Sequence, residues 1–294
     1  MILNILFIVI GIVLVLWGAD RLTDGAVAVA EKMKMPQIVI GLTIVAMGTS
    51  MPEFCVSLIS ALKGTSDLAV GNIVGSNIFN TLLIVGVSAL VAPMSIMKTT
   101  VRKDIPFALV ASALLLIMCL DGDISRIDAA ILFVMFLIFM YITLRGAKAQ
   151  GTDLEEKEKK PMATWLSVVW ILVGLVCLIG GSNLFVDGAT AVATKLGVSE
   201  AVIGLTIVAG GTSLPELATS VVSARKGNSG IAIGNVLGSN VFNILAILGL
   251  TGVISPMTLK GITMTDLSMM VISIILIWLF SFTKYKIERW EGAI

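Results

Sequence analysis

The sequence predicts an all-α integral membrane protein that consists of two inverted repeats of five helices. Hydrophobic residues make up 57% of the 294 positions and charged residues only 13%, whereas a soluble domain carries about 25% charged residues. Several apolar segments are long enough to cross a bilayer, which takes about 20 residues. Residues 41–93 also match residues 204–256, an offset of 163 positions, with 29 identities in 53 aligned positions and no gap.

The apolar segments predict nine membrane helices. The first segment lacks a basic leading region and a small-residue cleavage site, and residues 2–17 match residues 165–180 at the same offset. It is therefore expected to be a mature helix rather than a signal peptide. The predicted helices are 2–29, 37–62, 68–92, 104–120, 127–145, 164–193, 200–225, 231–254 and 264–282.

A single long polar stretch divides the chain. We expect a first transmembrane repeat at 1–145, a cytoplasmic linker at 146–162 and a second, inverted repeat at 163–294. The start of the fifth helix, 126–130, matches 289–293. The tenth helix of this fold is therefore expected to be missing, either because the sequence is truncated or because the protein works without that helix.

The distribution of basic residues predicts the orientation. With the N-terminus outside, 15 Lys and Arg residues fall in cytoplasmic loops and 4 in outside loops, as the positive-inside rule requires. Five helices per half then insert the second half with the opposite orientation. Inverted repeats are typical of alternating-access secondary transporters, whereas a channel usually reaches symmetry by oligomerisation.

Composition also excludes several functions. The chain has no His, its net charge is +1, and its three Cys residues lie apart in apolar segments. We expect no enzymatic activity, no cofactor and no nucleic-acid partner. The expected partners are ions and the lipid bilayer.

Each repeat carries the motif Gly-Thr-Ser-x-Pro-Glu inside an apolar segment. Pro52 and Pro215 lack an N–H group, so the second and seventh helices must break there. The break is expected to free backbone carbonyls at about 46–49 and 209–212, which is tolerable at membrane depth only if protein or an ion satisfies them. The oxygen-bearing side chains of the two motifs belong to Thr49, Ser50, Glu53, Thr212, Ser213 and Glu216.

Two intramembrane carboxylates suit a cation. Glu53 and Glu216 supply a charge of −2 and up to four hard oxygens, which suits Ca²⁺ with its 6–8 oxygen ligands. Because the carboxylates repel each other, an empty site is expected to take up protons or monovalent cations, and this competition is the physical basis of exchange. The alternative is a proline kink whose glutamate bonds a neighbouring helix.

The second motif, Gly-Asn-x-x-Gly-Ser-Asn-x-Phe-Asn, adds amides and hydroxyls. Its Ser and last Asn share a helix face in each copy, and its two glycines form a surface for close helix packing. The other asparagines are either packing residues or site residues. Asp24 and Asp187, which the repeat pairs, are interpreted as structural. The face toward the carboxylates carries Ser76, Asn80, Ser239 and Asn243.

These motifs resemble the two α-repeats of the sodium/calcium exchanger family, within the cation/calcium antiporter superfamily, over nearly the whole chain. The resemblance implies a ten-helix fold whose long first and sixth helices slide against a core that holds the ions. It implies Ca²⁺ bound by Glu53, Glu216 and the carbonyls of Thr49 and Thr212. It implies one Na⁺ site at Ala46, Thr49, Ser50, Ser76 and Glu53, and another at Ala209, Thr212, Ser213, Ser239 and Glu216, with Asn80 and Asn243 between them.

The chain departs from the family at one site position. Some members carry Asp where this chain has Asn243, so the formal charge of the site is −2 here rather than −3. The hypothesis is a monomeric Na⁺-driven Ca²⁺ antiporter of a prokaryotic plasma (inner) membrane that exports Ca²⁺. The alternatives are an antiporter linked to H⁺ or K⁺ on the same fold, and a cation channel or non-transporting membrane protein with a structural glutamate pair.

Overall fold

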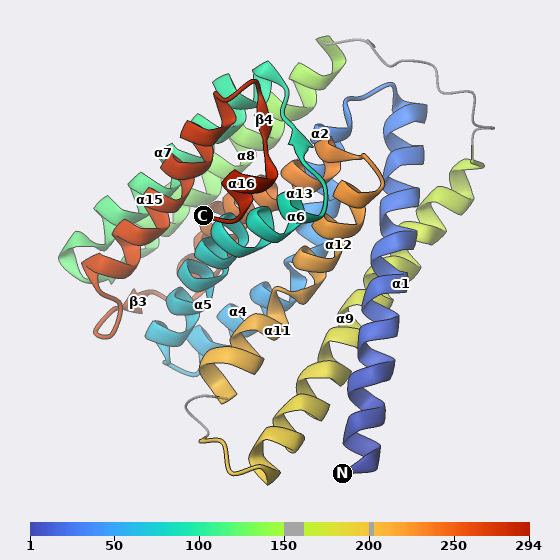
Figure 1. Ribbon diagram of the computed structural model, residues 1–294. Coiled ribbons are helices and arrows are strands. Elements are labelled where there is room, and N and C mark those ends of the chain that lie inside the picture. Colours follow the sequence, from blue (N-terminus) through green and yellow to red (C-terminus); the bar gives the residue numbers. More distant parts are fainter. Residues whose placement is uncertain (150–161, 200–202) are drawn as a thin grey trace.

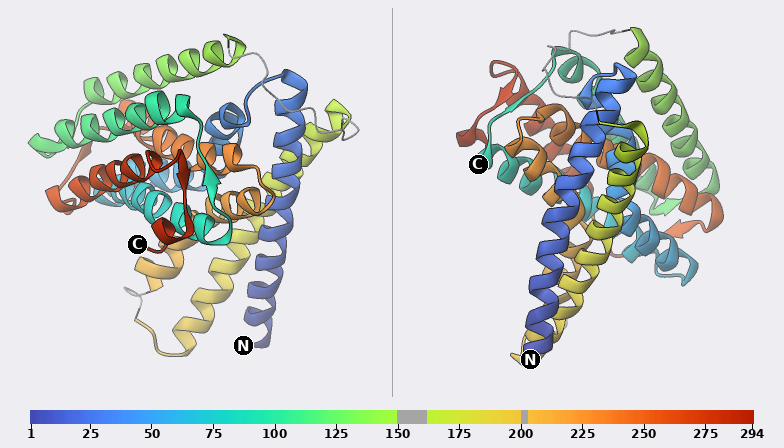
Figure 2. Two further views of the ribbon diagram at one scale, coloured as in Figure 1. Left: turned by 45° about the horizontal axis from the view of Figure 1, so that its top comes forward. Right: turned by 90° about the vertical axis from the view of Figure 1, so that its right-hand side faces the viewer.

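Two long helices, α1 (Ile2–Met33) and α9 (Thr164–Lys195), run side by side along one flank of a bundle of shorter helices (Figure 1). The computed structural model describes residues 1–149, 162–199 and 203–294. Most of the predicted linker, 146–162, lies outside the described residues. We call the end of the bundle where α8 ends and α9 begins the linker end, and the opposite end, where Met1 lies, the N-terminal end (Figure 2).

Glycines let the two long helices approach closely. A Cβ added at Gly174 would lie 2.8 Å from the carbonyl oxygen of Gly18 and 2.7 Å from the backbone nitrogen of Leu22. Gly11 and Gly181 meet in the same way, with each carbonyl oxygen within 2.8 Å of the Cβ that the other would carry. The small-residue contact between α1 and α9 is of the kind that holds membrane helices together.

The remaining elements follow the repeat. The first half contains α2 (Gln37–Ile40), η1 (Gly41–Val45), α3 (Ala46–Thr49), α4 (Met51–Leu62), α5 (Ser66–Phe79), η2 (Asn80–Ile84), α6 (Val85–Val91), β1 (Met94–Ser95), η3 (Thr100–Asp104), α7 (Ile105–Met118), η4 (Cys119–Asp121), β2 (Asp123–Ile124) and α8 (Arg126–Ala149). The second half contains η5 (Gly204–Val208), α11 (Ala209–Thr212), α12 (Leu214–Arg225), α13 (Ser229–Val241), η6 (Phe242–Leu248), α14 (Gly249–Ile254), β3 (Met257–Thr258), α15 (Met264–Ser281), β4 (Lys286–Ile287) and α16 (Arg289–Gly292).

Seven of the nine predicted membrane helices are confirmed, because seven described helices are long and apolar enough to cross a membrane. The predicted helix 37–62 is a pair, Gln37–Thr49 and Met51–Leu62, bent by 49°, which is either a broken span or a re-entrant loop. The predicted helix 200–225 begins outside the described residues, and its described part consists of η5, α11 and α12. Exposed apolar side chains cover the outer faces of α1 and α8, where lipid would contact them.

Short strands join the two halves at both ends of the bundle. β1 pairs with β4 through Met94 opposite Ile287, and β2 pairs with β3 through Ile124 opposite Met257. The 163-residue offset relates β1 to β3 and β2 to β4, so each pair contains one strand from each repeat. This reciprocal pairing is what a pseudo-two-fold axis in the membrane plane produces. Helix α16 starts at Arg289, the counterpart of the first residue of α8.

The close contact between α1 and α9 predicts that a side chain at Gly174 is destabilising. Gly174→Val should push the two helices apart and lower the free energy of unfolding by about 1–3 kcal/mol, as overpacking does. The matched control is Gly180→Val on the same helix, because a Cβ at Gly180 meets nothing within 4 Å. Thermal unfolding in detergent, followed by tryptophan fluorescence, measures the difference, and equal melting temperatures would contradict the packing argument.

Candidate cation site

Two helix breaks place the repeated Gly-Thr-Ser-x-Pro-Glu motif at the centre of the bundle. Ser50, with φ −83° and ψ 10°, separates α3 from α4, and Ser213, with φ −90° and ψ 6°, separates α11 from α12. A proline follows each break in the first turn of the new helix, as predicted. A wide π-helical segment, η1 or η5, precedes each break, and such segments are frequent at functional sites.

The two glutamates lie just after these breaks and are fully buried. Glu53 belongs to the first turn of α4 and Glu216 to the first turn of α12, and both have 0% exposure. The positive end of each helix dipole favours a carboxylate at this position. A helix start therefore offsets part of the cost of burying each charge at membrane depth.

One oxygen of each glutamate accepts hydroxyl groups from both repeats. Glu53 Oε1 accepts from Ser76 Oγ at 3.3 Å and from Ser213 Oγ at 3.1 Å. Glu216 Oε1 accepts from Ser50 Oγ at 2.8 Å and from Ser239 Oγ at 3.5 Å. The serine that follows the threonine of each motif thus donates to the glutamate of the other motif. Neither half completes its own carboxylate environment.

Four buried oxygens at this centre have no hydrogen-bond partner among the described residues. They come in two repeat-related pairs, one glutamate oxygen and one asparagine oxygen from each half: Glu53 Oε2, Glu216 Oε2, Asn80 Oδ1 and Asn243 Oδ1. A buried polar atom without a partner is costly unless something else satisfies it. Hard oxygen atoms of this kind are the ligands that Ca²⁺ and Na⁺ require.

The side-chain amides of Asn80 and Asn243 are oriented so that their nitrogens donate hydrogen bonds to other side chains. Asn243 Nδ2 donates to Asn77 Oδ1 at 3.0 Å and to Ser76 Oγ at 3.4 Å, and Asn80 Nδ2 donates to Asn240 Oδ1 at 3.2 Å. Assignment of amide oxygen and nitrogen rests on this network. Asn77 and Asn240 therefore orient the two site asparagines and serve as links between helices.

Another repeated pair, Asn72 and Asn235, was not singled out for the site by sequence reasoning. Asn72 Nδ2 donates to the backbone oxygen of Glu53 at 3.2 Å and to the serine hydroxyl one turn later at 3.0 Å. Asn235 makes the same two contacts around Glu216, at 3.2 and 3.0 Å. The signal available in the sequence was their recurrence at the 163-residue offset. They hold each glutamate helix against the following helix.

The alanine carbonyls differ from the prediction. The backbone oxygen of Ala46 accepts from Ser50 N at 3.1 Å and from Thr49 Oγ1 at 3.3 Å, and that of Ala209 accepts from Thr212 Oγ1 at 3.2 Å. These two carbonyls are therefore not left free by the helix breaks, because the nearby threonine hydroxyls bend back onto them. The Ala46 carbonyl already accepts two donors, one for each of its lone pairs.

The first motif segment (46–53) and the second motif segment (209–216) have different surroundings. Ala46 and Thr49 are fully buried, whereas Ala209 is exposed and Thr212 half-buried. Thr49 Oγ1 donates to Asn235 Oδ1 at 3.1 Å. Among the described residues, the side chain of Thr212 is paired only within its own segment.

The glycines of the second motif show the same difference. A Cβ at Gly238 would lie 2.7 Å from both Ala46 Cβ and Leu42 Cα, so α13 packs directly on the first motif segment. A Cβ at Gly75, its counterpart in α5, would meet nothing within 4 Å. The predicted close packing is therefore present at Gly238 and absent at Gly75. Helix α13 thus covers the first motif segment, whereas Gly75 and Ala209 are exposed at the surface of the bundle.

The described residues around the two glutamates do not form a cluster of ionisable metal ligands. In the described part of the chain, no group of three or more His, Cys, Asp or Glu side chains is placed to hold a metal ion. A cation at this centre would be held by two carboxylates together with neutral hydroxyl, amide and carbonyl oxygens. Oxygen atoms of these kinds suit a hard cation better than a transition metal, which prefers imidazole or thiolate ligands.

Comparison with known proteins agrees with this geometry. The family described as "Sodium/calcium exchanger protein" matches residues 3–145 and 166–294. The putative antiporter CaxA of Alkalimonas amylolytica is 38% identical over 262 residues, which cover 87% of this chain and 82% of the relative. The sodium/calcium exchanger MaX1 of Methanosarcina acetivorans is 32% identical over 332 residues, covering 99% and 95%.

Solved structures give the same result. The sodium-calcium exchanger NCX_Mj, soaked with Na⁺ and Sr²⁺, superposes with a TM-score of 0.87 at 32% sequence identity, covering 99% of this chain and 94% of that one. The all-α membrane fold is therefore shared along almost the full length of both proteins. The chain belongs to the sodium/calcium exchanger family.

Proposed function

We propose that the protein exchanges Ca²⁺ for Na⁺ across the plasma membrane by alternating access, with the paired carboxylates as a shared cation site. The observation that carries this proposal is the set of four buried, unpartnered oxygens, two from each repeat. Their chemistry matches the ions that the family's description and the name of NCX_Mj specify.

The residues around these oxygens support a Ca²⁺ site flanked by two Na⁺ sites. Ca²⁺ would be held by Glu53, Glu216 and the backbone oxygens of Thr49 and Thr212. One Na⁺ would be held at Ala46, Thr49, Ser50, Ser76 and Glu53, and the other at Ala209, Thr212, Ser213, Ser239 and Glu216. Because both ions use the same two carboxylates, a bound Na⁺ pair and a bound Ca²⁺ exclude each other.

The difference between the two motif segments supports alternating access. The first segment is covered by α13, while Ala209 of the second is exposed. Since the repeat relates these segments, the opposite state would seal the second and expose the first. Movement of the α1–α9 pair against the core would interconvert the two states.

Charge and orientation complete the proposal. The excess of basic residues at the linker end supports a cytoplasmic linker and an outside N-terminus, so the present state is open to the outside. With Asn243 in place of an acidic residue, the site carries −2, which one Ca²⁺ or two Na⁺ ions neutralise. In a cell that maintains an inward Na⁺ gradient, a monomer would export Ca²⁺.

Ion flux in proteoliposomes tests this function. Purified protein should take up ⁴⁵Ca²⁺ when an outward Na⁺ gradient is imposed, and uptake should saturate. If an outward H⁺ or K⁺ gradient drives uptake without Na⁺, then H⁺ or K⁺, and not Na⁺, is the driving ion. Ca²⁺ current down its own gradient without a counter-ion would reject a carrier in favour of a channel.

Removing either carboxylate should abolish Ca²⁺ transport. Glu53→Gln or Glu216→Gln leaves a charge of −1 against +2 in a buried site, and an unbalanced buried charge costs about 3–5 kcal/mol, so uptake should fall at least about a hundredfold. Glu31→Gln, at the exposed end of α1, is the control and should transport normally. Near-normal uptake by either folded site variant would rule out the shared carboxylate site.

The inverted orientation predicts where single cysteines react. In a background without Cys55, Cys119 and Cys177, cysteines at Lys63 and Lys195 should react with an impermeant maleimide from outside. A cysteine at Lys98 should react only from the cytoplasm. All three lysines are exposed.

One membrane crossing, formed by α5, η2 and α6, separates Lys63 from Lys98. Labelling of these two positions from the same side would therefore overturn the topology, whatever ions the protein carries. The cysteine-free parent, treated identically, measures background reaction.

Substitution of Asn243 by Asp should make transport depend more strongly on pH. The third carboxylate would lie beside Glu53 and Glu216, and like charges at close range favour binding of a shared proton. Na⁺-driven Ca²⁺ uptake should persist at neutral pH and fall more steeply on acidification than in the parent, because protons then compete with cations. Superimposable pH profiles would mean that Asn243 does not contribute to the ion site.

A further inference from the structure

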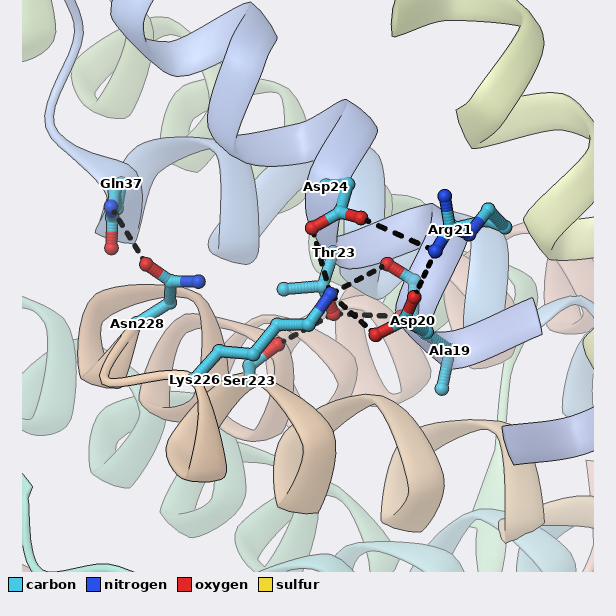
Figure 3. Close-up of polar contacts among 9 residues, drawn as sticks. All are labelled: Ala19, Asp20, Arg21, Thr23, Asp24, Gln37, Ser223, Lys226 and Asn228. Atoms are coloured by element: carbon cyan, nitrogen blue, oxygen red, sulfur yellow. Dashed lines mark hydrogen bonds and ion pairs between the residues drawn. The ribbon is translucent and has the colours of Figure 1, made fainter. Parts of the chain in front are cut away.

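An ion-pair cluster joins α1 to the core near the linker end. Lys226, just after α12, places its Nζ 2.5 Å from Asp20 Oδ1 and 2.7 Å from Asp24 Oδ1, and donates to the backbone oxygen of Asp20 at 3.2 Å (Figure 3). The three side chains are 28 to 34% exposed. One lysine thus bridges two carboxylates that lie one turn apart on the long helix.

Neighbouring contacts reinforce this cluster. Thr23 Oγ1 and Ser223 Oγ, both fully buried, form a hydrogen bond of 3.0 Å between α1 and α12. Arg21 contacts Asp20, lies 3.7 Å from Asp24, and places its guanidinium 5.1 Å from the ring of Trp170 on α9. The long-helix pair and the core are therefore held together at this end by charge and by a buried hydrogen bond.

The repeat supplies a counterpart that is open in this structure. At the 163-residue offset, Asp24 corresponds to Asp187 on α9 and Lys226 corresponds to Lys63 at the end of α4. Both Asp187 and Lys63 are exposed, and within the described ranges neither forms an ion pair. Helix α1 packs along α12, whereas α9 and α4 do not pack to a comparable extent there.

We propose that Asp24–Lys226 and Asp187–Lys63 are alternating latches, one closed in each access state. The inference rests on the proposed alternating access. In the present state the first pair holds α1 against α12 and keeps the linker end closed. In the opposite state the α1–α9 pair shifts along the core, the first pair separates, and Asp187 meets Lys63 to close the N-terminal end.

The two latches are unequal. The counterparts of Asp20 and Thr23 are Asn183 and Val186, so the second latch has one carboxylate instead of two. Val186 also has no hydroxyl to bond Ser60, the counterpart of Ser223. The protein without ions therefore favours the present state. Partly exposed ion pairs are weak enough to break in every transport cycle.

Paired cysteines test the alternation directly. In the cysteine-free background, Asp24→Cys with Lys226→Cys, and separately Lys63→Cys with Asp187→Cys, are treated with a short bifunctional thiol reagent in proteoliposomes. Each pair is also combined with a reporter cysteine at Ala209 or Ala46, and the reaction of the reporter with an impermeant maleimide is measured after the pair has been cross-linked. Because the reporter must not enter the cross-link, each reporter variant is also measured alone.

Both pairs should cross-link, each in a different state. Closing the 24–226 pair should leave position 209 reactive from the N-terminal end and position 46 protected. Closing the 63–187 pair should protect position 209 and make position 46 reactive from the linker end. Failure of the 63–187 pair to cross-link under any Na⁺ or Ca²⁺ condition, or unchanged reactivity at 209 after it does, would overturn the proposal.

Single charge removals give a second readout. Lys226→Met should lower the labelling rate at position 209 by about two- to fivefold, whereas Lys63→Met should leave it unchanged or raise it. Arg225→Met is the matched control, because Arg225 adjoins Lys226, is exposed and forms no ion pair in the described part of the chain. Equal rates in all three variants would reject the latch.

These measurements separate the latch from the transported ions. Labelling and cross-linking report conformation whether or not Ca²⁺ is carried. Vesicles of the parent protein that show mutually exclusive cross-links but no Na⁺-dependent Ca²⁺ uptake would keep the latch and reject the proposed ions. Normal Na⁺-driven uptake with no 63–187 cross-link would keep the proposed function and reject the latch.

Discussion

The burial of two carboxylates inside the helix bundle is the constraint on which the rest of the structure depends. An isolated charge in a low-dielectric interior is too costly to keep unless opposite charge, dipoles or hydrogen bonds compensate it. Glu53 and Glu216 each sit at a helix start and accept two serine hydroxyls. One oxygen of each still lacks a partner. That incomplete compensation makes the centre suited to a cation rather than to a permanent structural contact.

The inverted repeat explains why compensation comes from both halves. Ser213 donates to Glu53 and Ser50 donates to Glu216, so each motif is completed by the other. The strand pairs follow the same rule, since β1 pairs with β4 and β2 with β3. Folding of one half without the other would leave a carboxylate short of donors and a strand without its partner. The two repeats therefore form one folding unit with one shared site.

Pseudo-symmetry in sequence does not mean symmetry in the folded chain. Two copies of one motif occupy different environments, with Gly238 packed against the first motif segment and Gly75 free of contacts. Closing both ends at once would trap the ions, and opening both would let them leak. An arrangement in which one end is closed by packing and by the Lys226 cluster, while the other is open, avoids both outcomes.

Local chemistry was enough to predict much of this protein from its sequence. Hydropathy locates the membrane helices, and proline breaks two of them, because both effects act on neighbouring residues. The paired glutamates are identified by the 163-residue offset, because a repeat can be read directly from the sequence. Two predictions were wrong. Gly75 is not closely packed, because no neighbouring atom lies within 4 Å of the Cβ it would carry. The carbonyls of Ala46 and Ala209 are not free, because threonine hydroxyls donate to them. Only the tertiary structure decided which oxygens keep a free lone pair, how Asn77 and Asn240 turn the site amides, and that Lys226 reaches α1. These features depend on contacts between groups that lie far apart along the chain.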